Sequence, residues 1–249
     1  MRPSLVLLVL LLAGRGCVSY EFEHEFWLRV DGSGTVNITG RPELWNAFKG
    51  LGSSEDPEGT ATREAVRELF DRSGLDVRRV TLTWRRVRPY LFISADFEDL
   101  NALSPTPAFP DLRIGLHDEG DRLRLEGTWA RPKGASAGPS AQEDDLMAVR
   151  FHLPSKVYGH KNAFDGVERG NIVSWRQEVR EALAGGRLEV GASMDQRSIL
   201  GSTMILFATA IALAIAILTV VLLVVRRRGR RALEAGEENE DGSAAPRSS

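Results

Sequence analysis

Hydrophobic positions divide the chain into a long middle part with short periodic patterns and two uninterrupted apolar runs near its ends. The runs cover residues 5–13 and 204–225. In the middle part, apolar residues recur at every second position in several short segments and at helical spacing in two others. Alternation predicts strands and helical spacing predicts amphipathic helices, so we expect one folded domain, residues 20–197, between two hydrophobic segments that do not belong to it.

The first strands are predicted directly after the leader. Residues 20–30 alternate between apolar side chains, with His24 among them, and a second set that includes Trp27 and three glutamates. The Asp-Gly-Ser-Gly sequence that follows tolerates positive φ, and the alternation resumes at Val36 and Ile38. This pattern predicts a hairpin.

Two helices are predicted next. Pro42 can open the first, which Gly50 ends, and the second carries an apolar stripe that stops before Gly74. Further strands are predicted at 77–84, 90–97, 112–116, 123–129, 146–153, 171–177 and 187–192, with a flexible loop at 132–145. Strands joined mostly by short turns favour antiparallel pairing. The predicted fold class is therefore α+β: a mostly antiparallel sheet with the two early helices packed on one face, plus one C-terminal transmembrane helix.

The N-terminal run is too short to span a bilayer, and it has a basic start and small residues after it. Residues 1–16 therefore predict a signal peptide. Cys17 stands where the lipidated cysteine of a bacterial lipoprotein would stand, which predicts its acylation. The alternative is cleavage by an ordinary signal peptidase near Gly16 or Ser19.

The second apolar run predicts a transmembrane helix over residues 200–225. Five arginines follow within residues 226–231. Because positive residues remain on the cytoplasmic side, the helix should run from outside to inside. Residues 226–249 are then a basic stop-transfer cluster and a disordered acidic cytoplasmic tail. The predicted location is the cell membrane, as a single-pass protein with an extracytoplasmic domain.

Net charge and cysteine content bear on the expected partners and on the source of the protein. The net charge is -2 and the isoelectric point is about 6.1, so no nucleic acid partner is expected. Cys17 is the only cysteine. The exported domain therefore has no disulfide of its own, which favours a prokaryotic source.

No catalytic motif stands out. The sequence has no metal-ligand spacing, no HExxH motif and no phosphate-binding glycine loop, and spacing fixes no carboxylate partner for His24, His152 or His160. We therefore expect no enzyme activity, no metal and no cofactor. A hydrolase would be reconsidered only if the fold placed a histidine, a carboxylate and a hydroxyl together in a cleft.

Arginines surround one predicted hairpin. Alternation places Arg79 and Arg85 on one face of a strand and Trp84 on the other. These three residues are candidate ligand-binding residues, because guanidinium groups form bidentate contacts with the phosphates of lipids or anionic polymers. The alternative is a solvated strand face whose charges discourage edge pairing.

Several motifs then occur in one order along the chain. They are the leader ending in Cys17, the Asp-Gly-Ser-Gly turn, and late in the domain Pro154, Val157, Asn162, Gly166 and Trp175, all before the membrane helix. This layout resembles that of the LppM-type bacterial lipoproteins. The resemblance implies an envelope protein whose α+β domain binds an amphipathic ligand such as a phospholipid or glycolipid.

The leading hypothesis is a membrane-anchored binding or accessory protein of the bacterial cell envelope. A lipid would need an apolar cavity between the sheet and the helices, and the aromatic residues that could line it serve equally well as plain core. They are Phe48, Phe70, Trp84 and Phe92. The alternative is a structural or interaction protein that recruits envelope partners and has no small-molecule ligand.

Overall fold

The computed structural model describes residues 20–51, 60–85, 87–135, 138–139, 145–196 and 199–241. The chain divides into two units, one that ends at Ser198 and one that begins at Ile199. The predicted signal peptide 1–16, Cys17, parts of the predicted loop 132–145 and residues 242–249 lie outside the described residues.

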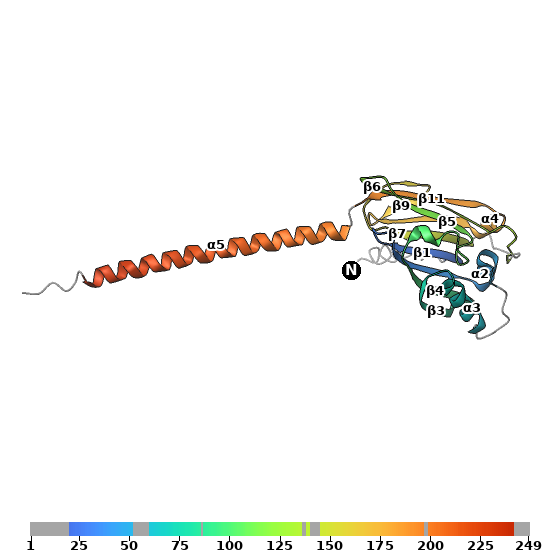
Figure 1. Cartoon of the computed structure of the whole chain (residues 1–249), viewed down its shortest axis with the longest axis horizontal. Coiled ribbons are helices and arrows are strands. Elements are labelled where there is room, and N and C mark those ends of the chain that lie inside the picture. Colours follow the sequence, from blue (N-terminus) through green and yellow to red (C-terminus); the bar gives the residue numbers. More distant parts are fainter. Residues whose placement is uncertain are drawn as a thin grey trace, which may run out of the picture. The chain divides into compact units, whose positions relative to one another are not determined.

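Seven strands form the larger sheet, in the order β3-β4-β2-β1-β7-β10-β9 (Figure 1). Their bounds are β1 Phe22–Leu28, β2 Gly34–Gly40, β3 Asp76–Arg85, β4 Arg88–Phe97, β7 Leu146–His152, β9 Phe164–Glu168 and β10 Ile172–Glu178. The predicted hairpin is confirmed as the antiparallel pair β1 and β2. Every neighbouring pair is antiparallel except β1 and β7, in which Phe26 lies opposite Phe151.

Four strands form a smaller antiparallel sheet, in the order β5-β6-β11-β8. Their bounds are β5 Leu112–Asp118, β6 Arg122–Ala130, β8 Val157–Lys161 and β11 Arg187–Asp195. The alternation along β6 places Leu123, Leu125 and Trp129 inward and Arg124 and Glu126 outward, because successive strand residues point to opposite faces. The sheet therefore has one apolar face and one charged face.

Short helices complete the domain. They are α2 Pro42–Lys49, α3 Thr60–Asp71, the 3-10 helix η1 Leu100–Leu103 and α4 Val179–Leu183. Helix α2 begins with Pro42 in its first turn and ends at Gly50, whose φ of 70° lets its N–H donate back to the Asn46 carbonyl. Helices α2 and α3 touch through Trp45 and Phe70, whose rings are 6.2 Å apart.

The prediction of an α+β domain with mostly antiparallel strands is confirmed. The finer prediction, one sheet with two early helices on a face, does not describe the fold. The strands form two sheets instead of one. Besides the two early helices the domain has η1 and α4, where the sequence pattern predicts short helices at about 98–103 and 179–184. The pattern along one strand predicts which side is buried but not which element covers it, and this difference explains the error.

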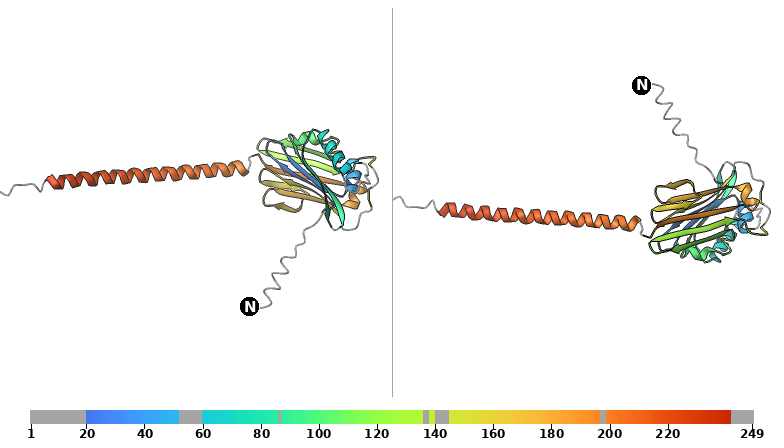
Figure 2. Two further views of the ribbon diagram at one scale, coloured as in Figure 1. Left: turned by 90° about the horizontal axis from the view of Figure 1, so that it is seen from below. Right: turned by 90° about the horizontal axis from the view of Figure 1, so that it is seen from above.

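The inner faces of both sheets and the helices share one hydrophobic core. Figure 2 shows the strands and helices of this domain from two further sides. Phe26 stacks on Phe151 across the parallel strand pair at 4.6 Å, and Phe48 of α2 meets Trp129 of the smaller sheet edge to face at 4.6 Å. Such aromatic pairs add about 0.5–1.5 kcal/mol each beyond their burial. The core therefore joins both sheets into one folding unit.

The strands also define two ends of the domain. Strand β7 runs parallel to β1 and passes from its C-terminal end into β8, where Val157 pairs with Met194. Asp195 follows Met194, and the next residue, Gln196, donates a hydrogen bond to Asp118 (2.9 Å). This end, the Asp195 end, thus lies at the C-terminal side of β1.

The opposite end contains the start of β1 and the β3–β4 turn. Glu21 directly precedes β1, and its carboxylate lies 3.9 Å from the guanidinium of Arg88 at the start of β4. Arg85, the last residue of β3, pairs with Arg88. We call this the Glu21 end.

The second unit is described by one helix, α5 Ile199–Asp241. Residues Thr203–Arg227 within it have a mean hydropathy of 3.0 and are long and apolar enough to cross a membrane. Helix α5 continues to Asp241, so it includes residues for which the composition predicted an unfolded tail.

Candidate functional site

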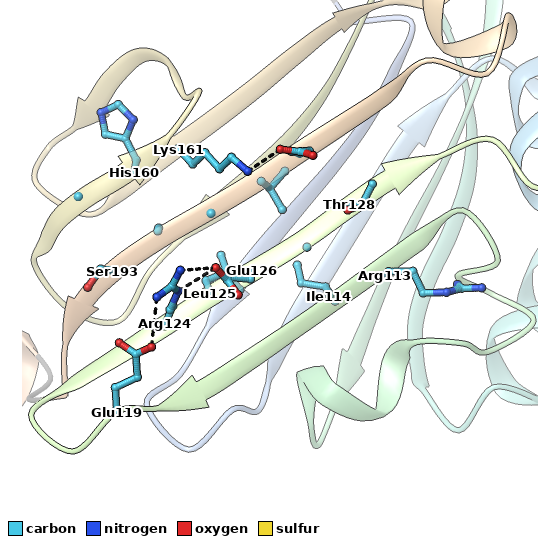
Figure 3. A pocket seen from close by; sticks show the side chains of 16 residues that line it. Arg113, Ile114, Glu119, Arg124, Leu125, Glu126, Thr128, His160, Lys161 and Ser193 are labelled. Atoms are coloured by element: carbon cyan, nitrogen blue, oxygen red, sulfur yellow. Dashed lines mark hydrogen bonds and ion pairs between the residues drawn. The ribbon is translucent and has the colours of Figure 1, made fainter.

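The outer face of the smaller sheet carries a hollow of about 590 Å³, which we call the outer trough (Figure 3). It lies over β11, between β6 and β8. Its floor is low because Gly191 and Ser193 are the outward residues of β11 there. Gly159 of β8 adds to this floor, and a Cβ atom placed on it would meet no other atom within 4 Å. Small residues thus keep the middle of the sheet face open.

Ion pairs hold both walls of the outer trough. On β6, the Arg124 guanidinium lies 2.6 Å from Glu126 and 3.4 Å from Glu119 (Figure 3). Hydrogen bonds and charge from Glu126 raise the pKa of Arg124. On the other wall, the Lys161 ammonium lies 2.5 Å from Glu189, and this hydrogen bond lowers the pKa of the Glu189 carboxyl. The walls therefore present charged groups of both signs in fixed positions.

Three further polar side chains of the outer trough remain available to a ligand. The Arg113 guanidinium donates to the Leu112 carbonyl (3.0 Å) and has no carboxylate partner within the described part of the chain. Thr128 and Ser193 contribute hydroxyl groups. An arginine, hydroxyl donors and fixed carboxylate acceptors suit a ligand rich in phosphate or hydroxyl groups, and they do not suit an acyl chain.

A second polar cluster lies inside the core, and the sequence patterns did not predict it as a cluster. The Lys49 ammonium at the end of α2 lies 2.6 Å from the Asp111 carboxylate, and both side chains are completely buried. Asp111 also accepts a hydrogen bond from the Trp129 indole (3.0 Å), and His24 lies 3.7 Å away. Neither ring nitrogen of His24 has a hydrogen-bond partner. This cluster joins β1, α2 and the smaller sheet.

Burial sets the charges of this cluster. Desolvation raises the pKa of Asp111 and lowers that of Lys49, while their mutual attraction opposes both shifts. Desolvation and the nearby Lys49 charge hold the pKa of His24 well below its usual 6.5. Only one cue was visible in advance: His24 occupies an apolar-face position of its strand.

The predicted ligand residues Arg79, Trp84 and Arg85 lie far from the outer trough, on edge strand β3 of the larger sheet. Arg79 covers the ring of Phe92 at 5.2 Å and Arg85 covers that of Tyr90 at 4.9 Å. The structure thus brings the two arginines onto one face. Trp84 points to the other face, so the three residues do not converge on one site.

The residues of the family-like motif, which are Pro154, Val157, Asn162, Gly166 and Trp175, contribute to the packing and turns of the fold. Val157 is buried in β8, Pro154 lies in the bend before it, and Asn162 and Gly166 adopt positive φ values of 55° and 75°. The buried Trp175 indole donates to the Lys161 carbonyl at 2.6 Å. Trp175 belongs to the larger sheet, and β8 forms one wall of the outer trough. This hydrogen bond therefore links the larger sheet to that wall.

The four aromatic residues expected around a lipid cavity do not form one. Phe48 and Phe70 are fully buried among other aromatic rings. Trp84 is 63% exposed, and Phe92 lies on the outer face of β4. The described core offers these side chains no shared cavity.

His152, for which spacing fixed no partner, has one in the structure. Its Nε2 atom lies 2.7 Å from Glu25, and its ring stacks on Trp27 at 4.7 Å. Both partners come from β1, which pairs with β7 in parallel. The described residues contain no group of three or more side chains able to hold a metal ion.

Comparison with known proteins gives one structural neighbour. It is the folded domain of the Mycobacterium tuberculosis protein LppM, solved by NMR, with 13% sequence identity and a TM-score of 0.38 over 76% of this chain and 97% of that domain. This is a weak, fold-level likeness to the family that the sequence motifs resemble. No family model and no curated protein matches the chain.

Proposed function

We propose that this protein is a single-span envelope protein whose exported domain binds the polar head of an amphipathic ligand, a phospholipid or glycolipid, in the outer trough. The observation that carries the proposal is the trough itself. It combines an open floor of small residues with walls of fixed charges and with Arg113, whose guanidinium lacks a carboxylate partner among the described residues. A head group needs donors and acceptors together, and guanidinium groups suit phosphate oxygens.

In this proposal the domain recognises the head group of the lipid and does not bind its acyl chains. Binding sites for apolar chains are enclosed and lined by hydrophobic residues. The outer trough is polar, and the described core is filled by its own aromatic side chains. The acyl chains would then remain in a membrane or a micelle while the head group is bound.

Filling the outer trough should abolish this binding. Gly159→Trp adds a side chain at a position where a Cβ atom would meet no other atom within 4 Å, so the backbone of β8 should accept the larger residue. We expect the full chain, extracted in mild detergent, to carry a specific lipid detectable by mass spectrometry, and Gly159→Trp to lose most of it. Ala65→Trp, on the exposed side of α3, should keep the lipid.

Equal lipid in both variants would exclude the outer trough as the site. A chain without lipid that crosslinks to a specific protein in intact membranes would support the rival function, recruitment of envelope partners.

We also propose that the domain is extracytoplasmic and that the arginines after α5's apolar part remain inside. Protease added outside intact cells should then digest the domain, which contains all five tryptophans, and spare the acidic tail. Cleavage of the tail with an intact domain would reverse the orientation. Acylation of Cys17 is part of the same proposal, and the intact mass of the mature N-terminus tests it.

A further inference from the structure

The β3–β4 turn carries an exposed apolar tip at the Glu21 end of the domain. Trp84 is 63% exposed and Val87 is 91% exposed. The local sequence, Trp-Arg-Arg-Val-Arg over residues 84–88, contains three arginines and no acidic residue. We call the described residues among these five, Trp84, Arg85, Val87 and Arg88, the hairpin tip.

The backbone conformation of the turn is also unusual at Val87. Val87 has a φ of 68°, in the left-handed region that glycine and asparagine favour in tight hairpin turns and that β-branched residues rarely adopt. Strained residues of this kind concentrate at binding and functional sites. At 91% exposure the Val87 side chain gains almost no burial from its own domain, so it is available for an apolar contact outside it.

The base of the hairpin tip is held firmly. Arg88 lies 3.9 Å from Glu21, and the Tyr90 hydroxyl donates to the same carboxylate at 2.8 Å. Arg85 lies over the Tyr90 ring at 4.9 Å. These contacts fix the direction of the strands that carry Trp84 and Val87, so the tip is presented on a rigid support.

We propose that the hairpin tip enters the interfacial layer of a lipid bilayer that contains anionic head groups. Tryptophan prefers this layer, because its ring is apolar and its N–H is polar. Arginines reach phosphates from there while their stems remain in the apolar layer, and each basic residue near an anionic surface adds attraction. The valine supplies the apolar contact.

This contact is additional to the span in α5 and independent of the outer trough. The hairpin tip lies at the Glu21 end, whereas the chain leaves the domain toward α5 from the Asp195 end, on the far side of the strands. Within the domain, the hairpin tip thus lies about one strand length from the Asp195 end, ~30 Å for the nine residues of β11 at ~3.3 Å each.

Lipid quenching of tryptophan fluorescence tests the proposal on the full chain. The chain is reconstituted in vesicles of phosphatidylcholine and phosphatidylglycerol that contain brominated acyl chains, and brominated vesicles are also added from outside. Helix α5 contains no tryptophan, so it contributes no signal. We expect brominated lipid to quench the wild type in at least one arrangement, and most of this quenching to disappear in Trp84→Phe.

Trp27→Phe is the matched control, because Trp27 lies near the end of β1 at the Asp195 side of the domain. Its replacement should leave the lipid quenching in place. Arg85→Gln together with Val87→Ser should reduce the quenching, and high salt should reduce it in the wild type. No quenching in either arrangement, or quenching lost in Trp27→Phe but kept in Trp84→Phe, would overturn the proposal.

Discussion

Replacing Lys49 by methionine is expected to lower the free energy of unfolding of the domain by about 3–5 kcal/mol. The change removes the ammonium 2.6 Å from Asp111 and leaves a carboxylate in a fully buried place. Asp111→Asn should cost a similar amount for the converse reason, although its amide can still accept the hydrogen bond from Trp129. Denaturant titration followed by tryptophan fluorescence reports on the domain alone, because every tryptophan lies in it.

The double variant Lys49→Met/Asp111→Asn separates the energy of the ion pair from the energy of packing around it. With both charges absent, the remaining groups carry no uncompensated charge, so Lys49→Met/Asp111→Asn should lose less than the sum of the single losses, by on the order of 2 kcal/mol. Glu68→Gln, which removes an exposed ion pair with Arg72, should change little. Additive effects of the two core variants would mean that the ion pair contributes no coupling.

The buried pair also explains part of what the sequence could not predict. Alternation correctly placed Phe22, Phe26 and Trp27 on their faces of β1, because burial of one face leaves a local pattern. Asp111 follows a proline-containing loop, and Lys49 ends a short helix, so neither stands in a pattern that marks burial. Their pairing is a contact between residues 62 positions apart, and no local rule specifies such a contact.

The same limit applies to the sheets and to the outer trough. Short turns predicted antiparallel neighbours, and β1–β2, β3–β4 and β5–β6 follow this rule. The parallel pairing of β1 with β7 joins segments more than a hundred residues apart, and it brings Glu25 to His152. The outer trough likewise needs β8 beside β11, which the sequence order does not indicate. Arg79 and Arg85 of β3 were predicted to share a face because they lie on one strand, six residues apart.

Acidification should destabilise the domain through His24. Burial and the Lys49 charge keep this imidazole neutral in the folded state, whereas in the unfolded chain it gains a proton below its ordinary pKa of 6.5. The unfolded state then binds more protons, so the free energy of unfolding should fall by about 1.4 kcal/mol for each pH unit below 6.5, or about 2 kcal/mol at pH 5. Above pH 6.5 this loss is absent.

The contribution of His24 is isolated by comparison with His24→Leu, which cannot take up a proton. Carboxylates that titrate in the same range affect both proteins alike, so the difference between their denaturation midpoints at pH 7.5 and at pH 5 belongs to His24. The wild type should lose more stability than the variant on acidification. Because neither ring nitrogen of His24 has a hydrogen-bond partner, leucine should cost little at pH 7.5, where burial of an unpartnered polar ring is itself unfavourable. Parallel pH profiles of the two proteins would mean that His24 takes up its proton in the folded state, which would require the core around Lys49 and Asp111 to admit water or to rearrange.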